Sequence, residues 1–174
     1  TGVYSLEGLV YGEYYVQETK APEYFVRDVN FYYFQIVNDG ETVEVSNDEL
    51  GKGTFINSPQ KGEIKIVKTS YDNKVEGFSF EVTGKTFTGQ TFSKIYTTDK
   101  DGIIRINDLR AGEYTIHEVK DEASAGYLLP EDKQLTIDRD GAMLVANMHN
   151  SKLPDNPPTG ASEDSFTQTA VIII

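Results

Sequence analysis

The chain repeats one of its own segments. Residues 102–119 (GIIRINDLRAGEYTIHEV) align without a gap on residues 2–19 (GVYSLEGLVYGEYYVQET). Six positions are identical: Gly2, Leu9, Gly12, Glu13, Tyr14 and Glu18 match Gly102, Leu109, Gly112, Glu113, Tyr114 and Glu118. An ungapped repeat of this length indicates that one folding module occurs twice. Any fold for this chain must therefore accommodate the same unit in two places.

The second copy is predicted to be all-β. Runs rich in β-branched and aromatic residues alternate with turn sequences such as YDNK, DKDG and RDG. The expected strands are residues 63–69, 77–84, 91–98, 102–108, 112–119, 133–138 and 142–148. Seven short strands in so few residues favour a β-sandwich.

The first copy contains only counterparts of the later strands. We expect strands at residues 2–8, 13–19, 24–28, 31–37, 41–46 and 53–57. The sequence therefore predicts three parts: the C-terminal portion of one module at residues 1–60, truncated at its N-terminus, a complete module at 61–150, and a Pro-rich linker at 151–174. The first module is expected to have an exposed sheet edge and an incomplete core.

Composition excludes several classes of function. The net charge of −12 argues against a nucleic-acid partner or an anionic membrane surface. The chain has no cysteine, which excludes disulfides and thiolate metal sites. Neither His117 nor His149 has a plausible set of metal-binding neighbours in sequence. We expect no metal, no cofactor and no enzymatic turnover.

Three predicted strands carry an apolar row that ends in a polar residue. Because side chains alternate along a strand, Ile64 and Ile66 lead to Lys68, and Tyr114 and Ile116 lead to Glu118. On residues 142–148, the same rule places Asn147 on one face with Met143 and Val145. An unpaired charge in a sandwich core is costly, so an amine, a carboxyl and a carboxamide on inward rows need a chemical reason.

One such reason is an intramolecular isopeptide bond. In an apolar site the pKa of lysine falls and that of glutamate rises, so Lys68 could attack the Asn147 carboxamide while Glu118 moves the protons. Two simpler interpretations stay open. Lys68 could extend to the surface and pair with Glu118 as an ordinary salt bridge, and Asn147 could be a turn residue.

The second copy resembles the Cna-B-like (collagen-adhesin B-type) repeat domain of Gram-positive adhesins and pilins. IVKTSYDNKVEGFSFEVTG, TTDKDGIIRINDLRAGEYTIHEV, GYLLP and LVANMH carry the resemblance, and ETKAPEYF of the first copy follows the family pattern E-x-x-A-P-x-x-[YF]. The resemblance implies tandem prealbumin-like or Ig-like sandwiches. It implies that Lys68 and Asn147 are crosslinked with Glu118 as the catalytic acid. In the first copy it assigns these roles to Glu18 and Asn57, with the lysine upstream of residue 1.

The sequence departs from the family pattern at several positions. Ser70 stands where many members have an aspartate, and EVKDEASAGY replaces E-x-x-A-P after Glu118. Asn150 is a competitor of Asn147 but lies on the opposite face by alternation. Asn47 is a weaker competitor of Asn57.

The linker contains NPPTG, which resembles the Leu-Pro-x-Thr-Gly sorting motif with Asn156 in the Leu position. The resemblance implies that a sortase recognises Pro157 and cleaves between Thr159 and Gly160. The final AVIII is the expected start of a membrane segment that continues beyond the chain. An ordinary Pro-rich tail is the alternative.

These patterns together predict an extracellular, cell-wall-anchored stalk or backbone region of an adhesin or pilin. The expected partners are sortase and either peptidoglycan or another pilin subunit. A host extracellular protein would be bound through the region upstream of residue 1. The alternative function is a module that itself grips a host protein or glycan, for which the many tyrosines of the first copy supply aromatic surface.

Overall fold

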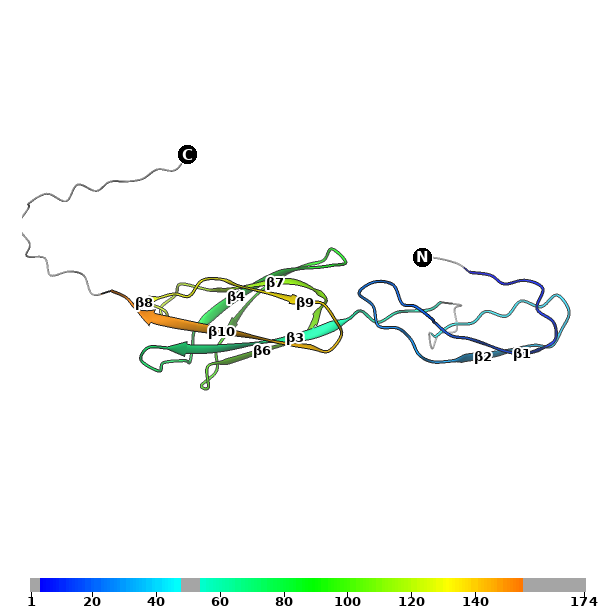
Figure 1. The fold of residues 1–174 in the computed structure, drawn as a ribbon, viewed down its shortest axis with the longest axis horizontal. Helices are drawn as coiled ribbons and strands as arrows, with labels where there is room; N and C mark the ends of the chain where they lie inside the picture. Colours follow the sequence, from blue (N-terminus) through cyan, green and yellow to red (C-terminus); the bar gives the residue numbers. More distant parts are fainter. Residues whose placement is uncertain (1–3, 48–53, 155–174) are drawn as a thin grey trace, which may run out of the picture.

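The computed structural model describes residues 4–47 and 54–154. Every regular element in these residues is a β-strand (Figure 1). Eight strands form a sandwich, and two form a separate sheet in the N-terminal segment, which we define as residues 4–47 and 54–60. The predicted all-β sandwich class is confirmed.

The sandwich consists of two four-stranded sheets. The first has the order β6-β3-β10-β8 and the second the order β5-β4-β7-β9. The strands are β3 (Lys61–Ser70), β4 (Ser79–Thr86), β5 (Thr91–Thr97), β6 (Ile103–Arg110), β7 (Gly112–Glu118), β8 (Tyr127–Leu128), β9 (Lys133–Ile137) and β10 (Ala142–Lys152). All seven strands predicted for the second copy are present, and the short β8 was not predicted.

The first and last strands of the sandwich are parallel neighbours. β10 pairs with β3 from Ala142↔Gly62 to Asn150↔Ser70, whereas the other pairs in the sandwich are antiparallel. The chain therefore enters the sandwich at one end of this pair and leaves it at the other end.

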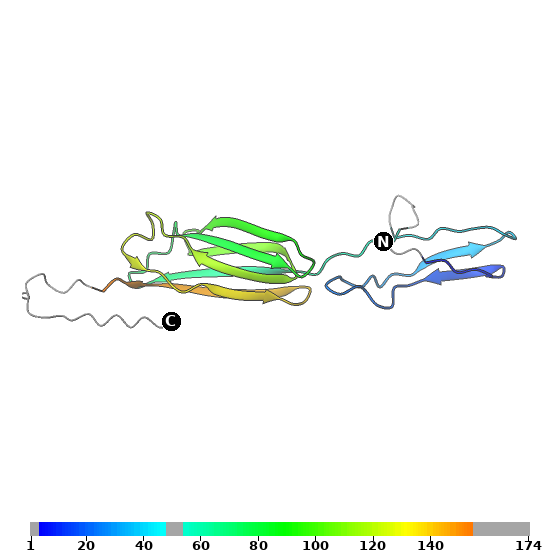
Figure 2. The ribbon, with the colours of Figure 1, turned by 90° about the horizontal axis from the view of Figure 1, so that it is seen from above.

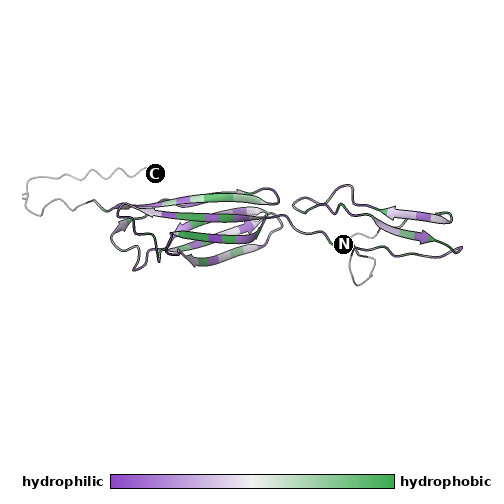
Figure 3. Ribbon diagram, turned by 90° about the horizontal axis from the view of Figure 1, so that it is seen from below, coloured by the Kyte–Doolittle hydropathy of each residue, from purple (hydrophilic) through white to green (hydrophobic). Residues whose placement is uncertain are grey.

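The core lies between the inner faces of the two sheets. Each strand alternates apolar and polar residues, visible as alternating bands along the ribbons (Figure 3). The core side chains are Ile64, Ile66, Phe78, Phe80, Val82, Ile104, Ile106, Leu109, Ala111, Tyr114, Ile116, Ile137, Ala142, Ala146 and Met148.

The inward face of β10 is the opposite of the predicted one. Ala142, Ala146 and Met148 are buried, whereas Met143 is 73% exposed and Val145 51% exposed. Both faces of β10 carry apolar residues, so the apolar row of Met143 and Val145 did not identify the buried face. The backbones of β3 and β10 also approach closely here, since a Cβ at Gly62 would lie 2.7 Å from the carbonyl oxygen of Ala142.

The N-terminal segment is more open than its sequence predicted. Of the six expected strands, β1 (Gly12–Val16) and β2 (Tyr32–Ile36) form an antiparallel pair, and Phe25 makes an isolated bridge with Pro59. The other expected runs are not strands in the described residues. None of the described residues of this segment is fully buried.

The sequence repeat has a structural counterpart. Tyr14 of β1 faces Phe34 of β2, and Tyr114 of β7 faces Leu135 of β9 in the same antiparallel register. The two tyrosine hydroxyls also make the same hydrogen bond, to the carbonyl oxygen four residues earlier, at 2.7 Å in both cases. β1 and β2 therefore match β7 and β9 position by position.

Backbone hydrogen bonds and one ring pair join the N-terminal segment to the sandwich, and the two lie end to end (Figure 2). The Gln60 amide donates to the Tyr24 carbonyl at 2.8 Å, and the Gln60 carbonyl accepts from the Ala111 amide at 2.9 Å. The Tyr24 ring stacks on Phe87 with centroids 4.6 Å apart. Gln60, at the junction, is thus hydrogen-bonded both to the N-terminal segment and to the sandwich.

Candidate functional site

Three polar side chains are buried together at one end of the sandwich core. Lys68 on β3 and Glu118 on β7 are each 1% exposed, and Asn150 on β10 is fully buried. Each follows an apolar residue on the inward row of its strand, Ile66, Ile116 and Met148 respectively. The site thus combines both sheets and both chain-terminal strands of the sandwich.

The predicted burial of Lys68 and Glu118 is confirmed, and that of Asn147 is wrong. Asn147 is exposed because it lies on the outer face of β10 with Met143 and Val145. Asn150, three residues further along, belongs to the inner face. The structure therefore brings Asn150, not Asn147, to Lys68 and Glu118.

Glu118 lies between the amide and the amine. Its Oε1 accepts a hydrogen bond from Asn150 Nδ2 at 2.6 Å, and its Oε2 lies 4.0 Å from Lys68 Nζ. Lys68 Nζ donates to the Thr69 carbonyl oxygen at 2.7 Å and lies 4.2 Å from the centre of the Phe78 ring. One carboxyl group therefore contacts the carboxamide with one oxygen and faces the amine with the other.

Burial shifts both groups of the pair toward their neutral forms. Burial lowers the pKa of Lys68, against the opposing attraction of Glu118 and Asp72. Burial also raises the pKa of Glu118, against the opposing hydrogen bond from Asn150 and the charge of Lys68. An uncharged amine is a nucleophile, and a protonated carboxyl can donate to an amide, so both shifts favour nucleophilic attack.

Two buried oxygens in the described residues have no hydrogen-bond partner. They are Glu118 Oε2 and Asn150 Oδ1, both in this site. Buried polar atoms in folded proteins are nearly always paired, so an exception calls for an explanation. A proton on Glu118 would supply a donor where the ionised carboxylate has none.

A hydrogen-bonded group lies beside the site: Asp72 and Tyr127, which the sequence did not point to, and Ser70, which it marked only as a departure from the family pattern. The Tyr127 hydroxyl donates to Asp72 at 2.8 and 3.0 Å, and Ser70 Oγ lies 2.8 Å from the same carboxylate. The Tyr127 ring packs edge-on against Phe78, with centroids 5.5 Å apart. We call Ser70, Asp72 and Tyr127 the clamp. Its hydrogen bonds lower the pKa of Asp72 and contribute to raising that of Tyr127 to about 12, for which burial is the larger cause.

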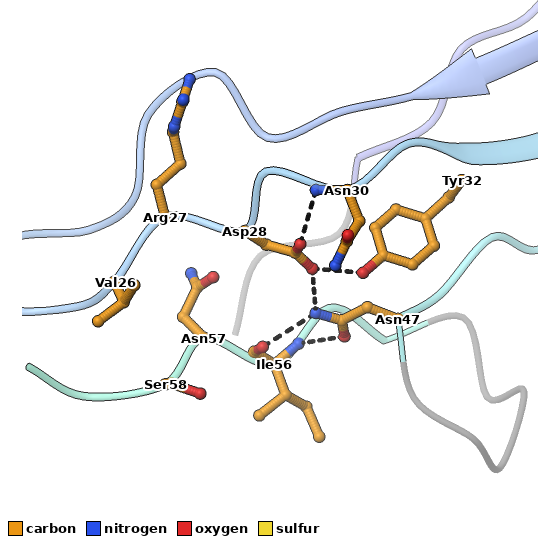
Figure 4. Close-up of a pocket in the computed structure, with 9 residues that line it drawn as sticks. All are labelled: Val26, Arg27, Asp28, Asn30, Tyr32, Asn47, Ile56, Asn57 and Ser58. Atoms are coloured by element: carbon orange, nitrogen blue, oxygen red, sulfur yellow. Dashed lines mark hydrogen bonds between the residues drawn. The ribbon is translucent and has the colours of Figure 1, made fainter.

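The structure describes both candidate residues of the first copy, Glu18 and Asn57. Glu18 is half-buried, and its Oε2 accepts a hydrogen bond from the Asp28 amide at 2.8 Å. Asn57 lines a pocket of about 280 Å³ with Asp28 and Asn47 (Figure 4). No hydrogen bond joins Glu18 to Asn57 in the described residues.

Asn47 and Asp28 make the hydrogen bonds of that pocket. Asn47 Nδ2 donates to Asp28 Oδ2 and to the Ile56 carbonyl, each at 3.0 Å, and Asn47 Oδ1 accepts from the Ile56 amide at 2.7 Å (Figure 4). Tyr32 also donates to Asp28. These bonds, that of Tyr32 first, lower the pKa of Asp28 to about 2. The weaker competitor Asn47 is thus hydrogen-bonded to a carboxylate, whereas Asn57 is not.

The sorting-like motif follows the last described residue, Pro154. Asn156, Pro157, Thr159 and Gly160 lie outside the described residues, as does AVIII. Within the described residues, no helix is long and apolar enough to cross a membrane.

A family comparison agrees with this architecture. The family model described as the SpaA prealbumin-like fold domain matches residues 1–49 and 62–152. The chain belongs to the SpaA prealbumin-like fold domain family. Two separate matched ranges are consistent with the repeat seen in the sequence and in the register of β1 and β2 with β7 and β9.

Solved structures share the fold. The Bacillus anthracis TIE protein is 24% identical with a TM-score of 0.62, over 83% of this chain and 26% of that one. A C-terminal fragment of the pilus adhesin SpaC from Lactobacillus rhamnosus GG is 16% identical with a TM-score of 0.54, over 87% of this chain and 81% of that fragment. This chain therefore spans about a quarter of the TIE chain. No curated protein sequence matches it.

Proposed function

We propose that this chain is a load-bearing stalk region of a cell-surface adhesin or pilin, and that an isopeptide bond between Lys68 and Asn150 reinforces it. The observation that carries the proposal is the buried Lys68, Glu118 and Asn150 site, in which one carboxyl group lies between an amine and a carboxamide. The family and the resemblance of the fold to a pilus adhesin fragment support the same role.

The reaction exchanges one amide for another. A proton passes from Lys68 to Glu118, and the neutral Nζ attacks Cγ of Asn150. Glu118 protonates Oδ1 as the tetrahedral centre forms and then takes one proton from the attacking nitrogen. It delivers this proton to Nδ2, which leaves as ammonia, and the Oδ1 hydroxyl returns its proton to Glu118. The products are a Lys68–Asn150 amide, ammonia and a protonated Glu118.

The fold supplies what this slow reaction needs. The three groups are held in a packed core by the neighbouring strands β3 and β10 of one sheet and by β7 of the facing sheet, so attack is effectively unimolecular and its effective molarity is high. Exclusion of water protects the neutral amine from protonation and the tetrahedral centre from hydrolysis. The reaction happens once in each molecule and turns over no external substrate.

The bond would change how the sandwich carries force. Tension enters at the start of β3, near Lys61, and leaves at the end of β10, near Lys152, because these are the first and last strands of the sandwich. The two strands are parallel neighbours. Lys68 and Asn150 lie near the far ends of both strands. Tension would then pass along β3, cross the new bond and exit through β10. Residues 69–149 would carry no load.

The proposal also covers the arrangement of the two modules and the place of the chain on the cell. Residues 1–60 and 61–150 act as two copies of one module arranged as a spacer. The chain lies on the outside of a Gram-positive cell, where a sortase joins Thr159 to peptidoglycan or to another pilin subunit. The registers of β1 with β2 and of β7 with β9 support the tandem modules.

Single-molecule force spectroscopy tests the load-bearing role. Pulling the wild-type chain from both ends should give no unfolding step for residues 69–149. The Asn150→Ala variant should release them, which adds about 270 Å at roughly 3.3–3.6 Å per residue. A wild-type trace with that full step would overturn the proposal. The Asn147→Ala variant is the matched control and should behave as wild type.

A further inference from the structure

Three aromatic rings form a cluster on the surface of the N-terminal segment. Tyr15 of β1 contacts Phe31 and Tyr33, with ring centroids 5.1 and 6.0 Å apart, and Phe31 and Tyr33 are 6.3 Å apart. The three residues are 59%, 48% and 76% exposed. Single exposed aromatic residues are common, but a contiguous exposed group indicates an interaction surface.

The cluster lies on the outward face of its sheet. Tyr14, the neighbour of Tyr15, stacks on Phe34 on the other face, with centroids 5.4 Å apart. Tyr14 matches Tyr114, which is buried in the sandwich core. The face of Tyr14 is therefore the inward one, and the face of Tyr15 corresponds to the outer face of β7 and β9.

The fold does not require aromatic residues at these positions. The matching register of the two strand pairs relates Tyr15, Tyr33 and Phe31 to Thr115, Gln134 and Asp132 respectively. The sandwich is complete with polar residues at all three positions, and there Asp132 pairs with His117 at 2.7 Å. The aromatic cluster is thus a property of the first copy alone.

The charge around the cluster suits a basic partner. Residues 1–60 contain ten acidic and three basic residues, whereas residues 61–150 contain fifteen and twelve. Glu13 lies on the same face as Tyr15, and its Oε1 accepts a hydrogen bond from Gln35 Nε2 at 2.9 Å. A carboxylate therefore borders the rings, in the more acidic part of the chain.

We propose that Tyr15, Phe31 and Tyr33, bordered by Glu13, form a docking surface for a basic polypeptide segment. Lysine or arginine side chains of that segment lie over the ring faces, where the ring electrons attract a cation. The sandwich has such a contact outside its buried site: Lys94 Nζ lies 4.9 Å from the centre of the Tyr96 ring. Glu13 and the negative charge of residues 1–60 attract the segment as it approaches.

A titration of the full chain with a hexa-arginine peptide tests this inference. Calorimetry gives the affinity, and the ring NMR signals of Tyr15 and Tyr33 report where the peptide binds. The variant with Tyr15→Thr, Phe31→Asp and Tyr33→Gln carries the residues of the second copy. It adds a negative charge, so simple charge attraction would bind the peptide more tightly. Loss of the ring contacts should instead weaken binding by about tenfold. In the triple variant, NMR contacts between the Tyr14 and Phe34 rings show that the sheet of β1 and β2 is intact.

The results separate the alternatives. Binding by the wild-type chain that the triple variant loses supports the docking surface. Equal or tighter binding by the variant overturns it, because charge alone would then explain the affinity. It is also overturned if the peptide fails to bind the wild-type chain, including the case in which a neutral oligosaccharide such as maltohexaose binds there instead.

Discussion

The side-chain amide of Asn150 donates a hydrogen bond of 2.6 Å to Glu118 in a site closed to solvent. The other carboxyl oxygen of Glu118 faces Lys68 Nζ at 4.0 Å. This arrangement places the nitrogen that must leave beside the group that can protonate it. Glu118 is therefore expected to act as an acid and a base in the proposed reaction.

Replacing Glu118 by glutamine should slow crosslinking by about 10²-fold or more, because the amide keeps the shape but cannot transfer protons. The rate is measured by mass spectrometry as ammonia is lost when the chain, prepared unfolded and uncrosslinked, folds for the first time. Glu113→Gln is the matched control, since Glu113 is an exposed residue of the same strand. An unchanged rate in Glu118→Gln would remove this residue from the mechanism.

The crosslinking rate should depend on pH with a bell shape. In the reactive state Lys68 is a neutral amine and Glu118 is protonated. Lower pH adds a proton to Lys68, and higher pH removes the proton from Glu118, and either change stops the reaction. Burial raises the pKa of Glu118 above 4.5 and lowers that of Lys68 below 10.5. The rate should therefore fall on the acid side at a pH above 4.5 and on the alkaline side below 10.5, with limits that belong to the coupled pair. A rate that rises steadily beyond pH 10.5 would contradict this.

The clamp can be separated into its charge and its hydrogen bonds. Asp72→Asn removes the charge but can still accept from Tyr127, so the pKa of Lys68 falls further and the alkaline limit moves to lower pH. Tyr127→Phe keeps the charge and removes the hydrogen bonds, so the maximum rate falls while the alkaline limit stays. Identical profiles for the two variants and the wild type would show that the clamp does not act on the site.

The clamp should also add stability that depends on pH. Its hydrogen bonds lower the pKa of Asp72 below the ordinary 3.8. A carboxyl whose pKa is lowered by folding contributes stability above its unfolded pKa, and this contribution is lost as the pH falls through the folded value. Tyr127→Phe should therefore lower the melting temperature at neutral pH more than at pH 2.

Asn150→Ala should cost roughly 4 kcal/mol of unfolding free energy, because a crosslink that closes a loop of this length restricts the unfolded chain. It also leaves Glu118 Oε1 without its partner. Asn147→Ala should change stability by less than about 0.5 kcal/mol, as is usual for exposed positions. Denaturant unfolding measures both. Equal losses for the two variants would contradict the assignment of Asn150.

Alternation along strands located Lys68 and Glu118 from the sequence, because β3 carries its two isoleucines, and β7 its tyrosine and isoleucine, on one face only. The same rule failed on β10. There Met143 and Val145 stand on the outer face and Ala142, Ala146 and Met148 on the inner face. Both faces of β10 thus carry apolar residues, and the buried one is set by how β10 pairs with β3 and packs into the core, which alternation along one strand does not report.

The clamp could not be predicted, because its members come together only in the folded chain. Asp72 lies in the turn after β3, and Tyr127 belongs to the two-residue strand β8. The YDNK sequence indicated a turn but gave no partner for its aspartate. The N-terminal segment shows the same limit. Asn47 contacts Asp28, which alternation along single strands did not bring into consideration.

The central claim is a covalent bond between Lys68 and Asn150, and mass spectrometry of the wild-type chain tests it most directly. The intact mass should be lower than the calculated mass by one ammonia, and tandem fragmentation of a digest should give a branched peptide that joins Lys68 to Asn150. Full calculated mass after complete folding, or a branch at Asn147, would contradict the account.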